Sequence, residues 1–137
     1  MAFTTENDVR TTFQLTSTTL VPSALIQARI NDAHAEMMHY LDPAFVSGPA
    51  PRDLIEGETL LAGARVLESL AAKDAFDQRQ VTVGGERIDA GERFASLRAI
   101  AIAAEKKAWT VLGPFVLACP VRPAACTTAS VPVLGEV

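Results

Sequence analysis

Few residues of this chain have types and spacings that could perform chemistry. His34 and His39 are five residues apart in an expected helix, so they do not share a face as residues three or four apart do. They therefore do not form the histidine pair of a metalloprotease helix, and we interpret both as solvent-exposed or interfacial side chains. Glu56 and Glu58 are two residues apart, which directs them to different faces of a helix and disfavours a paired-carboxylate site.

Nucleophiles and phosphate-binding loops are not indicated either. No serine lies in a Gly-x-Ser-x-Gly elbow, and the glycines of residues 83–91 (VGGERIDAG) fit neither a Walker A loop nor a dinucleotide fingerprint. Cys119 has no nearby histidine in the sequence and no helix N-terminus to lower the pKa of its thiol. Cys119 and Cys126 are too few for a four-ligand zinc site. We therefore expect no enzymatic activity, no cofactor and no metal.

The composition is that of a globular chain with a single core. Of its 137 residues, 49% are hydrophobic and 20% are charged, with a formal net charge of −4. Because there is no basic stripe, we do not expect binding to duplex DNA through its phosphates. There is no apolar run of transmembrane length and no secretory signal at the start. We therefore expect no membrane segment and reduced cysteines in a cytosolic compartment.

The spacing of apolar residues predicts one short and three long helices that position these side chains. Their expected ranges are about 5–14, 22–41, 52–73 and 92–112. Thr5 followed by Asp8 is a weak form of the capping box that starts the first helix. The core-facing stripes are Ile26, Ile30, Ala33, Met37 and Tyr40 in the second helix, Leu60, Ala64, Leu67 and Ala71 in the third, and Phe94, Leu97, Ala101, Ala104, Ala108 and Val111 in the fourth.

Two glycines lie inside the third helix, Gly57 and Gly63. Each costs about 1 kcal/mol in helix propensity, which suggests that the backbone of a neighbour approaches closely. The expected fold is mainly α: a small bundle of three long helices plus a short N-terminal helix. A β-hairpin precedes the last long helix, and an extended C-terminal tail follows it. The helical domain covers 1–112 and the tail covers 113–137.

Residues 80–90 are expected to form the hairpin. Apolar and polar residues alternate before Gly84-Gly85, a favourable pair for a two-residue turn. The edges of a lone hairpin invite pairing with another strand, unless the hairpin folds back on its own bundle. The candidate interaction residues of this arm are Val81, Val83, Gly84, Gly85, Arg87 and Ile88.

The tail, residues 113–137, is apolar and rich in proline, with Arg122 and Glu136 as its only charged residues. Four prolines exclude a long helix. An extended apolar segment needs another surface, either a partner or, as a strap, its own core. The candidate docking residues are Phe115, Val116, Leu117, Arg122, Val131, Val133 and Leu134. A chain with two such protrusions and no chemistry is more consistent with an assembly component than with a catalyst.

Three passages resemble the head–tail connector, or adaptor, proteins of long-tailed bacteriophages and of phage-derived gene transfer particles. TTENDVRTTF resembles the short first helix of that family, and LIQARINDAHAEMMHYLDP resembles its second helix. GETLLAGARVLESL, followed by VTVGGERIDAGERF, resembles the third helix and the hairpin before the last helix. The likeness covers about residues 3–112, whereas residues 113–137 match by position and character and not by motif.

The resemblance implies a structural virion protein at the neck, present in the host cytoplasm during assembly. It implies a homo-oligomeric ring, typically dodecameric, beneath the portal, which extends the DNA channel and joins the DNA-filled head to stopper or tail-completion proteins. The hairpin would contact a neighbouring subunit or the next ring, and the C-terminal segment would reach the portal protein. A mildly acidic ring is compatible with DNA that passes through the channel without specific binding.

Two alternatives stay open at this point. The helices alone fit a small intracellular, dimeric helical binding module or regulator equally well. A stopper or tail-completion protein is the neighbouring alternative within the virion, but those proteins are more often rich in β-structure.

Overall fold

The computed structural model describes residues 1–77, 82–83, 86–87, 91–118 and 120. These residues are mainly helical, as predicted. The elements are α1 (Glu6–Phe13), α2 (Ser23–Tyr40), the 3₁₀ turn η1 (Pro43–Phe45), α3 (Arg52–Asp77), α4 (Gly91–Leu112) and the 3₁₀ turn η2 (Gly113–Phe115). The helix limits lie within two residues of the predicted ones, except that α3 continues four residues further, to Asp77.

Local interactions explain where α1 begins and how it is joined to α2. The side chain of Asp8 accepts a hydrogen bond from the Thr5 backbone N–H at 2.9 Å, and the Thr5 hydroxyl accepts one from the Asp8 N–H, so the predicted capping box is present. At the other end, Arg10 donates to the carbonyl oxygen of Val21. Glu6 accepts hydrogen bonds from Ser23 and Arg10, which lower the pKa of its carboxyl group and tie α1 to the start of α2.

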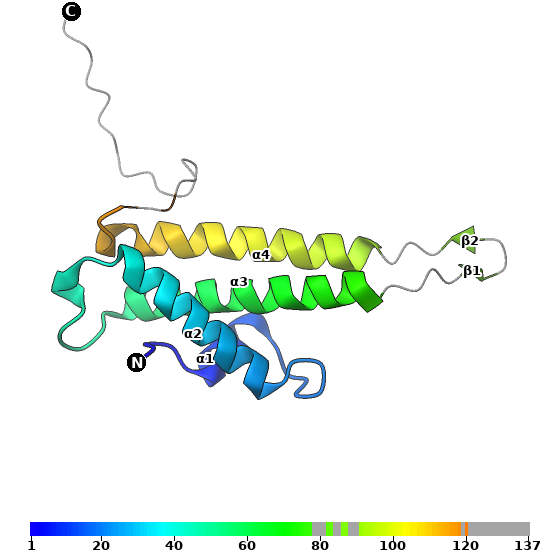
Figure 1. Ribbon diagram of the computed structural model, residues 1–137, viewed down its shortest axis with the longest axis horizontal. Helices are drawn as coiled ribbons and strands as arrows, with labels where there is room; N and C mark the ends of the chain where they lie inside the picture. Colours follow the sequence, from blue (N-terminus) through cyan, green and yellow to red (C-terminus); the bar gives the residue numbers. More distant parts are fainter. Residues whose placement is uncertain (78–81, 84–85, 88–90, 119, 121–137) are drawn as a thin grey trace, which may run out of the picture.

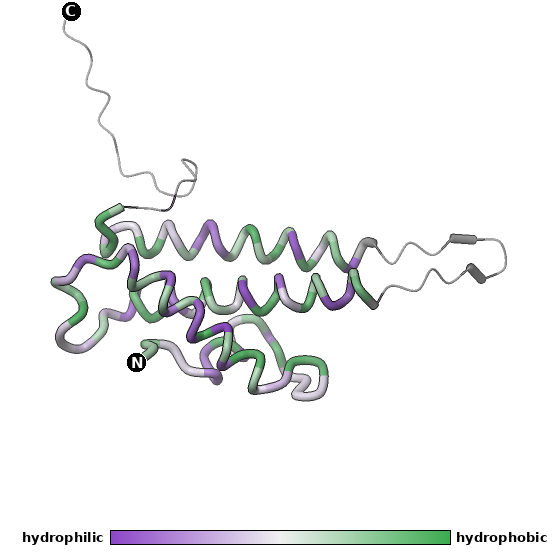
Figure 2. Tube along the Cα trace, in the orientation of Figure 1, coloured by the Kyte–Doolittle hydropathy of each residue, from purple (hydrophilic) through white to green (hydrophobic). Residues whose placement is uncertain are grey.

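The two longest helices, α3 and α4, lie side by side, while α2 crosses α3 and α1 packs beside it (Figure 1). Hydrophobic and hydrophilic positions alternate along α3 and α4 (Figure 2). The α3–α4 pair extends beyond the part that α1 and α2 cover, towards the strands (Figure 1). Among the described residues, one part of the pair therefore lies in a bundle, and the other part packs mainly against its partner helix.

Burial follows this arrangement. In α2 the predicted stripe is buried at Ile26, Ile30, Ala33 and Met37, with Tyr40 partly buried. In α3 the predicted positions are buried, but so are the residues between them, including Leu61, Ala62 and Val66. A single stripe underestimates the buried surface of α3 because α1, α2 and α4 all pack against it. In α4 the predicted alanines are buried, and Trp109 and Leu112 are buried with them.

The two glycines of α3 lie where neighbours approach closely, but the neighbours are side chains and not backbone. A Cβ atom on Gly63 would overlap the ring of Phe13 in α1, and a Cβ on Gly57 would overlap the side chain of Leu112 at the end of α4. The predicted close approach at these glycines is therefore present, but it is made by side chains and not by the backbone of a neighbour. Through these contacts the last residues of α1 and α4 pack against α3.

Two short strands, β1 (Thr82–Val83) and β2 (Glu86–Arg87), pair antiparallel, with Thr82 opposite Arg87 and Val83 opposite Glu86. They lie beyond the ends of α3 and α4 (Figure 1). The Gly84-Gly85 turn and the segments that join the strands to the helices lie outside the described residues, so the predicted hairpin arm as a whole stays a prediction. No helix in the described ranges has the length and apolar character needed to cross a bilayer.

Candidate interaction surfaces

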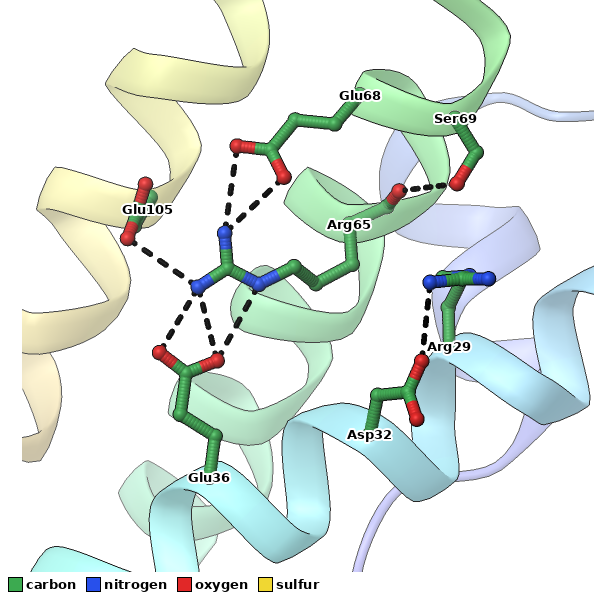
Figure 3. Close-up of polar contacts among 7 residues, drawn as sticks. All are labelled: Arg29, Asp32, Glu36, Arg65, Glu68, Ser69 and Glu105. Atoms are coloured by element: carbon green, nitrogen blue, oxygen red, sulfur yellow. Dashed lines mark hydrogen bonds and ion pairs between the residues drawn. The ribbon is translucent and has the colours of Figure 1, made fainter. Parts of the chain in front are cut away.

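Arg65 lies among three carboxylates that come from three different helices (Figure 3). Its Nη2 atom is 2.8 Å from Glu36 in α2 and 3.3 Å from Glu105 in α4, and its Nη1 atom is 3.1 Å from Glu68 in α3. Burial opposes the charge of Arg65, but the hydrogen bonds and negative charges of Glu36, Glu105 and Glu68 together outweigh it, so the pKa of Arg65 is raised. One guanidinium therefore links all three long helices, and the cluster keeps a surplus of negative charge.

A second polar cluster joins the N-terminal segment to α3. Glu58 is fully buried, and its Oε2 atom accepts hydrogen bonds from the backbone N–H groups of Phe3 and Thr4, each at 2.6 Å. Its Oε1 atom is 2.6 Å from Nδ1 of His34 in α2. The hydroxyls of Thr4 and Thr59 are also hydrogen-bonded at 2.6 Å. Because a buried carboxylate is costly without partners, these contacts explain why residues 3 and 4 lie against α3.

The histidines differ in their surroundings. His34 is partly buried against Glu58 and Phe3, so its side chain is more enclosed than the sequence interpretation suggested. His39 is exposed, with its ring edge-on to Tyr40 at a centroid distance of 5.0 Å. Within the described part of the chain, no three potential metal ligands are grouped so that they could hold an ion. The clusters of Arg65 and Glu58 are explained by the packing of helices and of the N-terminal segment.

A groove of about 270 Å³ lies between α3 and α4, next to the Arg65 cluster. Its apolar part is formed by Ala71 and Ala72 of α3 and by Phe94 and Ile102 of α4. Its charged residues are Glu68 and Glu105, which also contact Arg65, and Arg98. This combination of an apolar floor and a charged edge suits a peptide segment better than a small reactive substrate.

The start of the predicted tail lies against its own chain. The Phe115 carbonyl accepts a hydrogen bond from the Asp42 N–H at 2.9 Å, and the Phe115 ring packs edge-on against Phe45. Val116 forms an isolated antiparallel bridge with Leu41. Phe115 and Val116 are thus partly buried as a strap, which was the alternative interpretation of this segment.

At Leu117 the backbone contacts the bundle while the side chain is exposed. Its backbone N–H donates to the Tyr40 carbonyl at 2.9 Å, while its side chain is 71% exposed. The other candidate residues of the tail, Arg122, Val131, Val133 and Leu134, lie outside the described residues, as do Cys119 and Cys126. Of the hairpin candidates, Val83 and Arg87 lie in β1 and β2, whereas Val81, Gly84, Gly85 and Ile88 lie outside the described residues.

The sequence interpretation missed the partners of Arg65 and Glu58. The Arg65–Glu68 spacing of three residues was a local signal, but Glu36 and Glu105 come from other helices. A glutamate at position 58 among apolar residues of a long helix was the available signal for a buried carboxylate. Comparisons with protein-family models, with curated proteins and with solved structures found no match to this chain.

Proposed function

We propose that this chain is a structural head–tail connector of a phage-like particle. In this role it forms a homo-oligomeric ring beneath the portal, extends the DNA channel, and joins the DNA-filled head to the neck and tail. The proposal starts from the resemblance of three sequence passages to connector proteins. It does not invoke catalysis, and its partners are other copies of the chain, the portal protein and the next neck component.

The observation that carries the proposal is the shape of the α3–α4 pair. The two helices extend past the covering helices α1 and α2, and β1 and β2 lie beyond their ends (Figure 1). Phe76, near the end of α3, is 92% exposed. A large apolar side chain and strand edges at the same end of a molecule are features that contacts with other subunits would cover.

The tail supplies the second contact in this proposal. Phe115 and Val116 are held against Phe45 and Leu41, and Leu117 is hydrogen-bonded to Tyr40, so the start of the tail is anchored to the bundle. A docking segment anchored in this way reaches a partner with less loss of conformational entropy than one that starts from a free end. The segment beyond residue 120 is the part that we assign to portal binding.

The test is the mass of the purified chain in solution, alone and after mixing with the portal protein of the same particle. We expect the mixture to contain a complex in which several copies of the chain are bound to one portal ring. A tight dimer that does not bind portal would contradict the connector and favour the dimeric regulator.

A truncation separates the role of the tail from that of the bundle. Removing residues 121–137 keeps Phe115 to Leu117 in place, so the bundle should stay folded, as circular dichroism would show. We expect this variant to lose attachment to DNA-filled heads. If the truncated chain still joined heads to tails, the assignment of portal binding to the tail would be wrong.

A further inference from the structure

The groove between α3 and α4 has an acidic end and an apolar floor. At the acidic end, Glu36, Glu68 and Glu105 surround the single guanidinium of Arg65, so this cluster has two negative charges in excess (Figure 3). The side chain of Glu68 is 43% exposed, so the excess charge faces solvent. The apolar part of the groove is lined by Ala71, Ala72, Phe94 and Ile102. A partner that fits this groove therefore needs a basic part next to an apolar part.

The solvent-facing side of α4 has these two properties. We call its five exposed residues the outer face of α4: Ala99, Ile100, Ala103, Lys106 and Lys107. They lie within a stripe about 120° wide around the helix, with the apolar residues first and the lysines last. The Lys107 ammonium is 3.9 Å from Glu56, a contact between exposed side chains that contributes little. The outer face is therefore apolar at one end and basic at the other.

The groove and the outer face match in length as well as in charge. Along the outer face, Ile100 and Lys107 are seven residues apart, about 10 Å along the helix axis. Along the groove, Phe94 and Glu105 are eleven residues apart, about 16 Å. When the lysines of an outer face lie at the acidic end, its isoleucine therefore still lies over the apolar part of the groove. Arg98, which also lines the groove, then faces the apolar end of the outer face and not its lysines.

The two surfaces lie on different sides of the same helix. With about 100° between successive residues, the centre of the outer face and the centre of the groove residues of α4 are about 145° apart around the helix axis. The groove lies in the part of the α3–α4 pair that extends beyond α1 and α2 (Figure 1). A helix that lies in this groove beside α2 extends the cover that α2 gives to the rest of the pair. One copy can hold such a helix while its own outer face lies in the groove of another copy.

We propose that the outer face of α4 in one copy of the chain binds the α3–α4 groove of a second copy, head to tail. The partner's Lys107 pairs with Glu68 and Glu105. The partner's Ile100 covers the apolar floor next to Ala72. Because the two surfaces differ, the contact repeats from copy to copy and forms a ring where the rotation between copies closes. The inference deepens the proposed function by naming its subunit contact, and it rests on that function for the closure into a ring.

The experiment is sedimentation velocity of the full chain at concentrations up to about 1 mM. Ala72→Lys puts a cation and a long side chain in the groove, and Ile100→Lys removes the apolar centre of the outer face. Ala28→Lys, at an exposed position of α2 on neither surface, is the matched control. We expect the wild type and the control to form species larger than a dimer, and the other two variants to stay monomeric. A monomeric wild type, or variants that assemble as the wild type does, overturns the proposal.

An equimolar mixture of the two variants tests the head-to-tail arrangement directly. Ala72→Lys keeps an intact outer face and Ile100→Lys keeps an intact groove, so one pairing between the variants remains. We expect the mixture to form a dimer and nothing larger, because the other groove and the other outer face are blocked. A mixture that stays monomeric while the wild type assembles overturns the proposal, since a two-fold contact or another surface is then responsible.

Portal binding separates a failure of this contact from a failure of the connector. Ala72 and Ile100 lie outside residues 121–137, to which we assign portal binding, so both variants should still bind portal, but with fewer copies per portal ring than the wild type. Variants that reach the wild-type number of copies show that the contact is wrong while the connector stands. A wild type that assembles head to tail but does not bind portal shows that the contact stands while the connector is wrong.

Discussion

At the scale of single residues, the carboxylate of Glu58 is the most consequential side chain in the described part of the chain. It is fully buried and serves as acceptor for two backbone N–H groups, while its other oxygen contacts His34. Each of these donors would be left without its partner if the carboxylate were removed. A buried donor without an acceptor costs more free energy than a satisfied hydrogen bond contributes. The stability of the fold is therefore sensitive to substitution at Glu58.

We expect Glu58→Leu to lower the free energy of unfolding by about 3 kcal/mol, because it leaves the N–H groups of Phe3 and Thr4 without an acceptor. Urea denaturation followed by circular dichroism measures this change. Glu56→Leu is the matched control, since Glu56 is exposed and its contact with Lys107 is 3.9 Å. It should change stability by less than about 0.5 kcal/mol. Equal effects of the two substitutions would contradict the role assigned to Glu58.

At the scale of elements, Arg65 links three helices by directional ion pairs. Apolar packing alone fixes the relative positions of helices less specifically. It binds carboxylates of α2, α3 and α4 at once. Its pKa is raised in the folded state, so any stability linked to its own titration is complete below its unfolded pKa and is lost only at strongly alkaline pH. Between pH 4 and 9, Arg65 itself should therefore add no pH dependence.

We expect Arg65→Met to lower the free energy of unfolding by about 2 kcal/mol at pH 7, because three carboxylates then face one another in a half-buried site. The deficit should shrink as the salt concentration rises, since counter-ions screen the repulsion among the carboxylates. Thermal unfolding at several salt concentrations measures this trend. Lys107→Met, at an exposed side chain, is the control. A deficit that is constant with salt would show that lost packing, and not charge, is responsible.

The limits of the helices could be predicted from the sequence, whereas the contacts between helices could not. Helix limits follow from local signals, such as the pair Thr5 and Asp8, and these predictions are confirmed to within a few residues. Burial on several sides of α3 depends on how many helices surround it, which one stripe of periodicity does not encode. The Arg65 cluster depends on residues 29 and 40 positions away in sequence. Local patterns thus predicted elements, while contacts between elements required the fold.

At the scale of the whole molecule, the α3–α4 pair is supported unevenly. From Leu54 to Leu67 most residues of α3 are buried, whereas beyond Ala71 the residues Ala72, Lys73 and Phe76 are exposed. The first part is covered by three helices, and the second is covered mainly by α4 (Figure 1). Local stability should follow this difference in burial.

We expect native-state hydrogen exchange to separate these two parts. Amides from Leu61 to Val66 should exchange only through global unfolding, because opening them breaks contacts to α1, α2 and α4. Amides from Leu70 to Phe76 should exchange faster through local opening, with little dependence on denaturant. Mass spectrometry or NMR at increasing urea concentrations measures both. Equal protection along all of α3 would show that α4 alone supports the far part fully.

The Arg65 cluster also affects which substitutions this sequence can accumulate during evolution. Arg65 pairs with three carboxylates, so a substitution at any one of Glu36, Glu68 or Glu105 leaves the guanidinium with two acceptors. A substitution at Arg65 removes all three ion pairs at once. Selection should therefore tolerate single substitutions at the glutamates and remove substitutions at the arginine. The order in which mutations arrive matters here, because the arginine becomes replaceable only after its acidic partners have been lost.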